Sequence, residues 1–394
     1  NHAAYDPSRR TWLATAAVSA MGSLFVDPSN ANTNTNANPL PTEDRRGYSL
    51  RFPTLFDPLY GPSSRKTIKR SLDASGSDSD AGTIWALEQN LELGPLQTPL
   101  RCTVIMLRDG TLWVHAPVAP TQEFFELVES CGVQDSTVAH LVVPTYALEH
   151  KVFAKDCLQR WPNAQLWTSQ GQFSFPWRGA GDELVFGKAV DGVLGNAQTP
   201  EPPWRDEIDY RTLEGGTFSI GGTPTTLSET AFFHKATKTL IVTDSVARIS
   251  ADVPPLNDPD RLLLVSKRST SDPMPEDTPE ARLAGWKKTA LLVSYFFPEH
   301  EELDPDRPGT VVWTDGWEDN FAALSEQLIV PPVVRTLIYA QNPSRVKEWV
   351  DDVATIWDFE KIVPAHFEAP IAAGPSDLRR AFRFLDDPAL DAFP

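Results

Sequence analysis

Cysteine is scarce in this chain of 394 residues, which contains only three. The number is odd, so at least one cysteine cannot pair within the chain. No C-x-x-C spacing occurs, and apolar residues lie close to each of Cys102, Cys131 and Cys157. That pattern argues against a framework of disulfides. We expect buried free thiols, and a disulfide or ligand role is the alternative.

Positive charge is also in short supply. Lysine and arginine number 35 against 53 aspartate and glutamate residues, which gives a formal net charge of -18. A protein that binds a phosphate backbone needs a basic face, and no basic cluster is present, so we expect no nucleic-acid partner. With 41% hydrophobic and 22% charged residues, the chain has the composition of a soluble globular protein with ample core.

Residues 1–40 contain a short apolar run but not one of comfortable membrane-spanning length. The twin-arginine motif in Ser8–Leu13 leads into the apolar Ala14–Val26, which has the length of a signal-peptide core. We therefore predict a targeting or anchor segment, with a cleavage site near Ser29–Ala31 or membrane contact through the apolar run. The alternative is a plain apolar helix after a chance pair of arginines.

Residues 41–95 are expected to form an irregular arm. Phe52–Pro62 carries aromatic residues between prolines, and Ser71–Asp80 is polar and acidic, which is typical of a mobile loop.

The remaining residues, 96–394, are expected to form one α/β domain. Its first half has the order β-β-α-β-α-β, the pattern of one half of a four-layer sandwich, from these segments: Arg101–Leu107, Thr111–His115, Glu123–Ser130 (capped by Thr121), Thr137–Val143, Lys151–Trp161 and Ala164–Thr168. In the second half we expect strands at Gly215–Gly222, Glu229–Phe233, Thr239–Thr243 and Lys361–Pro364, and helices at Glu280–Phe297, Ser344–Trp357 and Ser376–Asp387. The Pro- and Asp-rich Ile249–Pro279 is expected to be a loop insertion.

The stretch Val143–Lys151 carries the strongest functional signal. A β-branched strand ends there in a polar turn and leads into a helix, and Glu149 and His150 lie in the turn. In α/β proteins, side chains at the carboxyl end of a strand point into a crevice that loops can close.

Thr145–His150 aligns in register with the signature His-x-His-x-Asp-His of metallo-β-lactamase-fold proteins. Three longer segments, Leu141–Pro176, Phe233–Asp244 and Trp357–Phe367, resemble the chloroplast and cyanobacterial branch of domain of unknown function 4336, a family assigned to that fold. The likeness runs from about residue 95 to the C-terminus. It implies a metallo-β-lactamase-like four-layer αββα sandwich with an irregular N-terminal extension.

The resemblance implies one metal site at most. Thr145 and Ala147 occupy the positions of the two early histidines, and no histidine lies between His150 and His234, so the first site of the fold is expected to be absent. The second site maps onto Glu149, His150, Asp244 and His366. Two carboxylates and two imidazoles suit zinc, iron or manganese.

Each of these four residues could instead have a purely structural role, and in that case no ion is bound. Glu149 could complement a helix dipole and Asp244 could cap a turn, while the two histidines could be satisfied by hydrogen bonds alone. His115, Thr145 and His234 are further candidates for the crevice, and the two histidines among them, at strand ends, are as readily structural.

Two functions remain open from the sequence. The favoured one is a non-catalytic accessory or assembly protein of a photosynthetic membrane complex, because the first metal site is missing. The alternative is a one-metal hydrolase of an ester, thioester or phosphoester. The chloroplast-type resemblance and the twin-arginine motif together predict a two-step address, in which a transit peptide is removed first, and a location in or at the thylakoid lumen.

Overall fold

The computed structural model describes residues 65–73, 82–93, 96–172, 181–220, 223–295, 300–304, 307 and 310–386. The predicted targeting segment, Phe52–Pro62 and most of the acidic loop lie outside these residues. Within them, no helix combines the length and apolar character needed to cross a membrane.

A seven-stranded sheet forms one half of the molecule, with its strands in sequence order. The strands are β1 (Ile68–Ser71), β2 (Ile84–Leu93), β3 (Leu96–Met106), β4 (Leu112–His115), β5 (Val138–Val143), β6 (Gln165–Thr168) and β7 (Gly192–Val193). β1 to β4 pair antiparallel, whereas β4 to β7 pair parallel. The carboxyl ends of β4 and β5 therefore point to the same edge of the sheet.

A five-stranded sheet in the order β16-β15-β10-β9-β8 forms the other half. Its strands are β8 (Ile208–Ile220), β9 (Thr223–His234), β10 (Thr239–Ile241), β15 (Lys361–Val363) and β16 (Ile371–Ala372). β10 and β15 pair parallel, so the loops that follow them leave the sheet at one edge. Asp244 and His366 are in those two loops.

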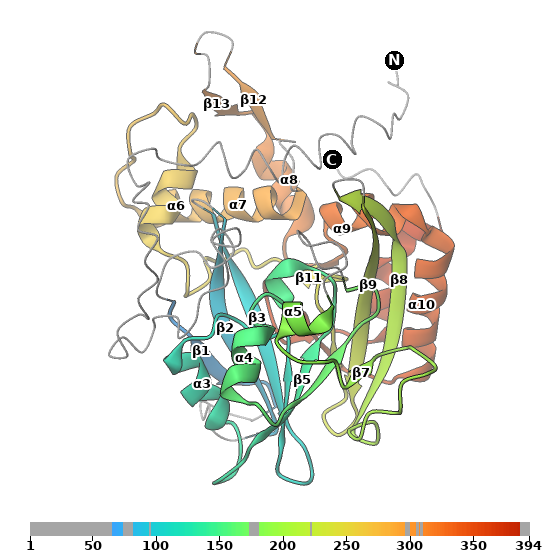
Figure 1. Cartoon of the computed structure of the whole chain (residues 1–394). Helices are drawn as coiled ribbons and strands as arrows, with labels where there is room; N and C mark the ends of the chain where they lie inside the picture. The colour runs from blue at the N-terminus through green and yellow to red at the C-terminus, as the bar shows by residue number, and fades with distance from the viewer. Residues whose placement is uncertain are drawn as a thin grey trace.

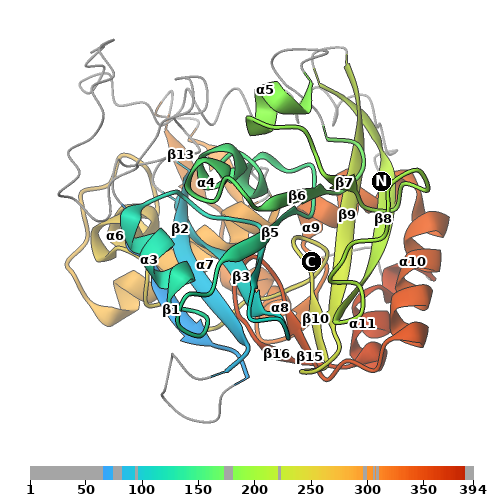
Figure 2. The same ribbon diagram turned by 60° about the horizontal axis from the view of Figure 1, so that its bottom comes forward.

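Helices cover the outer face of each sheet, and the two inner faces pack together (Figures 1 and 2). The first sheet carries α3 (Gln122–Glu129), α4 (Ala154–Arg160) and α5 (Asp182–Phe186); the second carries α9 (Pro332–Leu337), α10 (Pro343–Ile356) and α11 (Pro375–Ala381). Trp113 and Val142 from the first sheet meet Phe232 and Ile241 from the second in the apolar layer between them. This is the predicted four-layer αββα arrangement.

Further elements complete the described chain. Three short 3-10 helices occur, η3 (Leu148–His150), η4 (Tyr339–Gln341) and η5 (Arg383–Leu385). A separate apolar cluster joins α6 (Pro259–Ser266), α7 (Pro279–Tyr295) and α8 (Trp317–Leu324), near the small ladders β12–β13 (Glu301–Leu303, Val311–Trp313) and β11–β14 (Ala247–Arg248, Leu328–Ile329). Gly285 permits the close approach of α7 to α6, since a Cβ there would lie 2.0 Å from the carbonyl oxygen of Leu262.

Several sequence predictions need correction. The expected irregular arm contains β1 and β2, which pair with each other and join the main sheet, so ordered structure begins well before residue 96. The expected loop insertion contains α6, started by Asp258 as N-cap with Pro259 in its first turn. β8 begins at Ile208, before the expected Gly215, and the final helix α11 ends at Ala381. Strand pairing, which local propensity does not report, explains the longer strands.

Other predictions are confirmed. Thr121 caps α3 through a hydrogen bond to the amide of Phe124, and α10 is amphipathic with its apolar side buried. The three cysteines are free and buried, because each lies in the apolar layer between the first sheet and its helices.

Candidate metal centre

The turn after β5 is fastened to the second sheet. Thr145 pairs with Glu229 of β9, and its hydroxyl donates to the carbonyl oxygen of Ser228 at 3.0 Å. The single turn η3 then directs Glu149 and His150 into the space between the sheets, where the His150 side chain is fully buried. Thr145 therefore connects the turn after β5 to β9 and does not act as a metal ligand.

Glu229 shapes the loop that presents Asp244. The amides of Thr243 and Ser245, one on each side of Asp244, both donate to Glu229 Oε1, at 2.8 and 3.3 Å. The hydroxyl of Tyr339 donates to Glu229 Oε2 at 3.5 Å. A buried carboxylate that accepts from the two loop amides flanking one residue restricts the direction of the side chain between them.

Arg101 fixes the loop that carries His366, as Glu229 fixes the loop of Asp244. Its amide donates to the carbonyl of Ala365 at 2.8 Å, and its guanidinium donates to the carbonyls of Pro364 and Phe367. The ring of His366 is fixed as well, because its Nδ1 lies 3.1 Å from the carbonyl oxygen of Pro99.

The four residues predicted as ligands lie together. His150 Nε2 and His366 Nε2 are 3.2 and 3.4 Å from the same oxygen, Asp244 Oδ1. Ligand atoms of Glu149, His150 and His366 lie within 4.8 Å of one another. In the part of the chain that the structure describes, this is the one group of three or more His, Cys, Asp or Glu side chains with such spacing.

The donors gathered around Asp244 Oδ1 fit a cation. A carbonyl can only accept, so Nδ1 carries the proton in the bond to Pro99. Burial lowers the pKa of His366 to about 4, although Asp244 opposes this, so the neutral ring points the lone pair of Nε2 at a carboxylate oxygen. Two acceptors at 3.4 Å repel unless a positive charge lies between them.

The protonation of the other two ligands is coupled to the same carboxylate. Burial alone would lower the pKa of His150, but Asp244 more than offsets it and the pKa is raised. Burial raises the pKa of Glu149, and Asp244 adds to this although His150 opposes it. Two imidazoles and two carboxylates, one of which is a Glu in place of the expected Asp, are a donor set that zinc, iron or manganese accepts.

The remaining candidates occupy different places. His234 lies five positions beyond Glu229, roughly 17 Å along β9, where its Nδ1 contacts the hydroxyl of Thr237 at 2.8 Å. It is not part of this centre. His115 ends β4, with its ring stacked on Trp113 and against the edge of Phe232.

Backbone strain occurs beside two of these histidines. Ala116 follows His115 with φ 51°, and Phe367 follows His366 with φ 56°. Both are buried, non-glycine residues in the left-handed region, which costs about 1–2 kcal/mol each. Strain of this kind persists where the surrounding structure holds a residue for function.

Sequence analysis missed Glu229, Arg101 and Tyr339. The available signal was a charged residue inside an apolar strand, since both Glu229 and Arg101 lie in segments expected to be buried. Buried charges need partners, but the partners here are backbone groups of loops far away in sequence, which no spacing in the chain reveals.

Replacing Glu229 by glutamine tests its role. The glutamine side chain keeps one acceptor oxygen and replaces the other by an NH2 donor, so it cannot accept from both loop amides and from the Tyr339 hydroxyl, and Asp244 loses its fixed direction. We expect metal affinity to fall about tenfold or more while the fold is retained, as for other residues that orient metal ligands. Titration with zinc measures this. Glu214→Gln, an exposed change on β8, is the control, and equal affinities in both variants would contradict the assignment.

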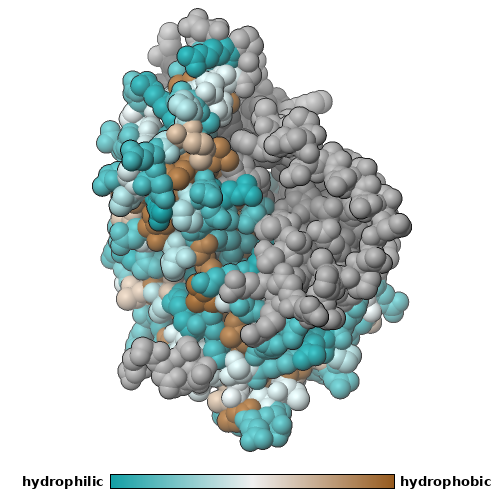
Figure 3. All heavy atoms as spheres, turned by 90° about the vertical axis from the view of Figure 1, so that its left-hand side faces the viewer, coloured by the Kyte–Doolittle hydropathy of each residue, from teal (hydrophilic) through white to brown (hydrophobic). Residues whose placement is uncertain are grey.

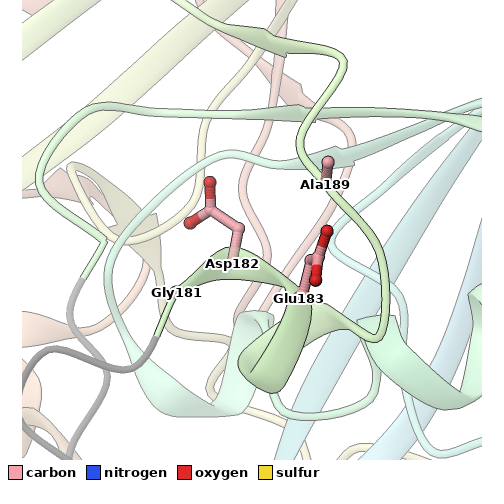
Figure 4. A pocket seen from close by; sticks show the side chains of 4 residues that line it. All are labelled: Gly181, Asp182, Glu183 and Ala189. Atoms are coloured by element: carbon pink, nitrogen blue, oxygen red, sulfur yellow. The ribbon is translucent and has the colours of Figure 1, made fainter.

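In the described part of the chain, neither the hollow beside α5 nor the exposed apolar residues offer an alternative metal centre. A hollow of about 580 Å³ beside α5 is lined by Gly181, Asp182, Glu183 and Ala189 (Figure 4) and contains no imidazole. On the face in Figure 3, hydrophobic side chains form separate patches among hydrophilic ones. The exposed large apolar residues of the described chain lie apart from one another, for example Val133 in a bend, Leu264 on α6 and Ile356 on α10, and single exposed apolar residues of this kind are common.

Comparison with known families identifies the family to which the segments quoted above belong. A family model described as "Domain of unknown function (DUF4336)" matches residues 81–384. The chain belongs to this family. Among curated proteins, none matches the chain.

Solved structures with a similar fold include metallo-β-lactamases. One from Pontibacter korlensis is 11% identical and covers 82% of this chain and 100% of its own, with a TM-score of 0.33. One from Hirschia baltica is 10% identical, with coverages of 82% and 97% and a TM-score of 0.35. A mono-zinc form from Pseudomonas aeruginosa is 9% identical, with coverages of 82% and 96% and a TM-score of 0.36. At such identities the likeness concerns the fold alone.

Proposed function

We propose that this member of the DUF4336 family binds one transition metal ion through Glu149, His150, Asp244 and His366 and hydrolyses an ester, thioester or phosphoester. The observation that carries the proposal is the convergence of His150 Nε2 and His366 Nε2 on Asp244 Oδ1, at 3.2 and 3.4 Å, beside Glu149. An ion held there would act as a Lewis acid and lower the pKa of water.

Partial exposure of the cluster favours catalysis over a purely structural ion. His150 is fully buried, whereas 15% of the His366 side chain and 20% of the Asp244 side chain remain exposed. Catalytic sites keep a position open to solvent, while structural sites are closed by protein ligands. Asp244 is thus placed both to hold the ion and to orient a group that enters from solvent.

Hydrolysis assays test the proposal directly. The protein loaded with zinc, iron or manganese is offered a chromogenic ester, a thioester and a phosphodiester, beside the isosteric Asp244→Asn variant. We expect turnover of at least one class, and at least a hundredfold loss in the variant, since the charge that holds the ion is removed. An ion-loaded protein without turnover would refute the catalytic part.

A second candidate is the non-catalytic accessory protein of a photosynthetic membrane complex. It is supported by Thr145 and Ala147, which stand at ligand positions of the fold and contribute no imidazole, so any ion is held without a neighbouring ion to share the substrate. The thylakoid location and membrane partner proposed with it rest on residues 1–40. Co-purification of the full chain with thylakoid membranes tests them.

A further inference from the structure

His115 is a buried imidazole without a partner. Its side chain is 1% exposed, and in the described part of the chain neither Nδ1 nor Nε2 has a hydrogen-bond partner. Leaving both nitrogens of a buried ring unsatisfied is costly, and such groups are rare outside functional sites. Trp113 and Phe232 cover the ring with apolar surface, so neither offers it a conventional donor or acceptor.

The register of the first sheet directs this ring toward the metal centre. Side chains alternate along β4, so His115 shares the inner face with Trp113, while Val114 packs on the outer helices. His115 is the neighbour of Val142 on β5, at the carboxyl ends of both strands. The turn that carries Glu149 and His150 leaves from this same edge.

Electrostatics place His115 within range of the cluster but apart from it. Burial and, to a smaller extent, His150 lower the pKa of His115 to about 3, although Asp244 opposes this. The ring is therefore neutral, with one N–H donor and one lone pair. Among the described residues, it does not belong to the group whose ligand atoms lie within 4.8 Å of one another, so we treat it as a neighbour of the cluster and not as a ligand.

We propose that His115 hydrogen-bonds a substrate oxygen bound at the metal centre beside His150 and Asp244. This assignment rests on the proposed function and adds a substrate-binding residue to it. A neutral donor suits a carbonyl or phosphoryl oxygen, because it stabilises charge that develops there without repelling a cation. The strained Ala116 holds the ring at the strand end, where its amide donates to the carbonyl of Val142 at 3.0 Å.

Azide binding to the cobalt-loaded full chain tests the inference without relying on turnover. His115→Phe keeps the ring stacked on Trp113 and removes both nitrogens, while His115→Gln restores a donor. The control is His140→Phe, another buried ring on the inner face, whose electrostatic partners are Asp109 and Asp191. Cobalt content and the azide-induced change in the visible spectrum are measured for each variant.

We expect about one equivalent of cobalt in all four proteins. Azide affinity should fall roughly tenfold in His115→Phe, the effect of one lost hydrogen bond, and largely recover in His115→Gln. Unchanged azide affinity in His115→Phe would overturn the inference alone. Loss of cobalt in that variant would also overturn it, because His115 would then be a ligand. Absence of cobalt from the wild-type chain would refute the proposed function itself, and this inference with it.

Discussion

Replacing His366 or His150 by alanine should abolish metal binding. Each change removes one of the two imidazoles that face Asp244 Oδ1 at 3.2 and 3.4 Å, and the remaining donors no longer enclose the ion. We expect about one equivalent of metal in the wild-type chain and less than roughly a tenth of that in either variant. Elemental analysis after dialysis against a weak chelator measures it.

The matched control is His234→Ala. His234 is also buried and also lies at a strand end, but its Nδ1 contacts Thr237 on a different part of the second sheet. The His234→Ala variant should retain the full equivalent of metal. Equal metal loss in all three variants would point to general unfolding, and equal retention would show that the cluster binds no metal.

Replacing Arg101 by methionine should destabilise the protein by about 3–5 kcal/mol, the usual cost of removing one partner of a buried ion pair. The Arg101 side chain is 1% exposed and lies 2.6 Å from Glu88 Oε1. Its loss also leaves the carbonyl oxygens of Pro364 and Phe367 without the hydrogen bonds that the Arg101 guanidinium donates. Urea unfolding measures the change. Because those carbonyls flank His366, metal affinity should fall with stability.

Arg70→Met is the matched control. Arg70 pairs with the same carboxylate, at 2.8 Å, but its side chain is 36% exposed, so its removal should cost less than about 1 kcal/mol. Equal costs for the two arginines would contradict the role assigned to Arg101.

The pH dependence of stability follows from Glu88. Burial opposes ionisation, but Arg101 and Arg70 outweigh it and lower the pKa of Glu88 from 4.5 to about 2. The native state therefore binds this proton less readily than the unfolded state. The contribution, roughly 3 kcal/mol at most, is complete above pH 4.5 and is lost as the pH falls toward 2. In Arg101→Met this acid-dependent loss should largely disappear.

Local pattern accounts for much of the first half of the fold. The turn at Asp109-Gly110 with the strand that follows it, the helix capped by Thr121 and the strand before Val143 were predicted with nearly the bounds observed, whereas β3 begins at Leu96 and not at the predicted Arg101. Turn residues and caps act within a few positions, so the sequence displays them directly. β1 and β2 were missed because their stability comes from pairing with β3 and not from a strong local signal.

The predicted ligands Glu149, His150, Asp244 and His366 came from a family signature and three short segments of the sequence. The structure brings these four residues together. Sequence alone could not separate His115 from His234, since both are histidines at the ends of apolar strands. The side of the sandwich on which each strand ends separates them: β4 ends beside the turn of His150, whereas β9 ends well away from it.

What the chain encodes locally is therefore its elements, its lack of disulfides and the residues able to bind an ion. These depend on composition and on spacing over a few residues. Whether the ion site exists depends on contacts between segments that are far apart in the chain: Glu229 holding the loop of Asp244, and Arg101 holding the loop of His366. Distances among side chains arise only when the two sheets pack, because packing alone sets which loop ends meet.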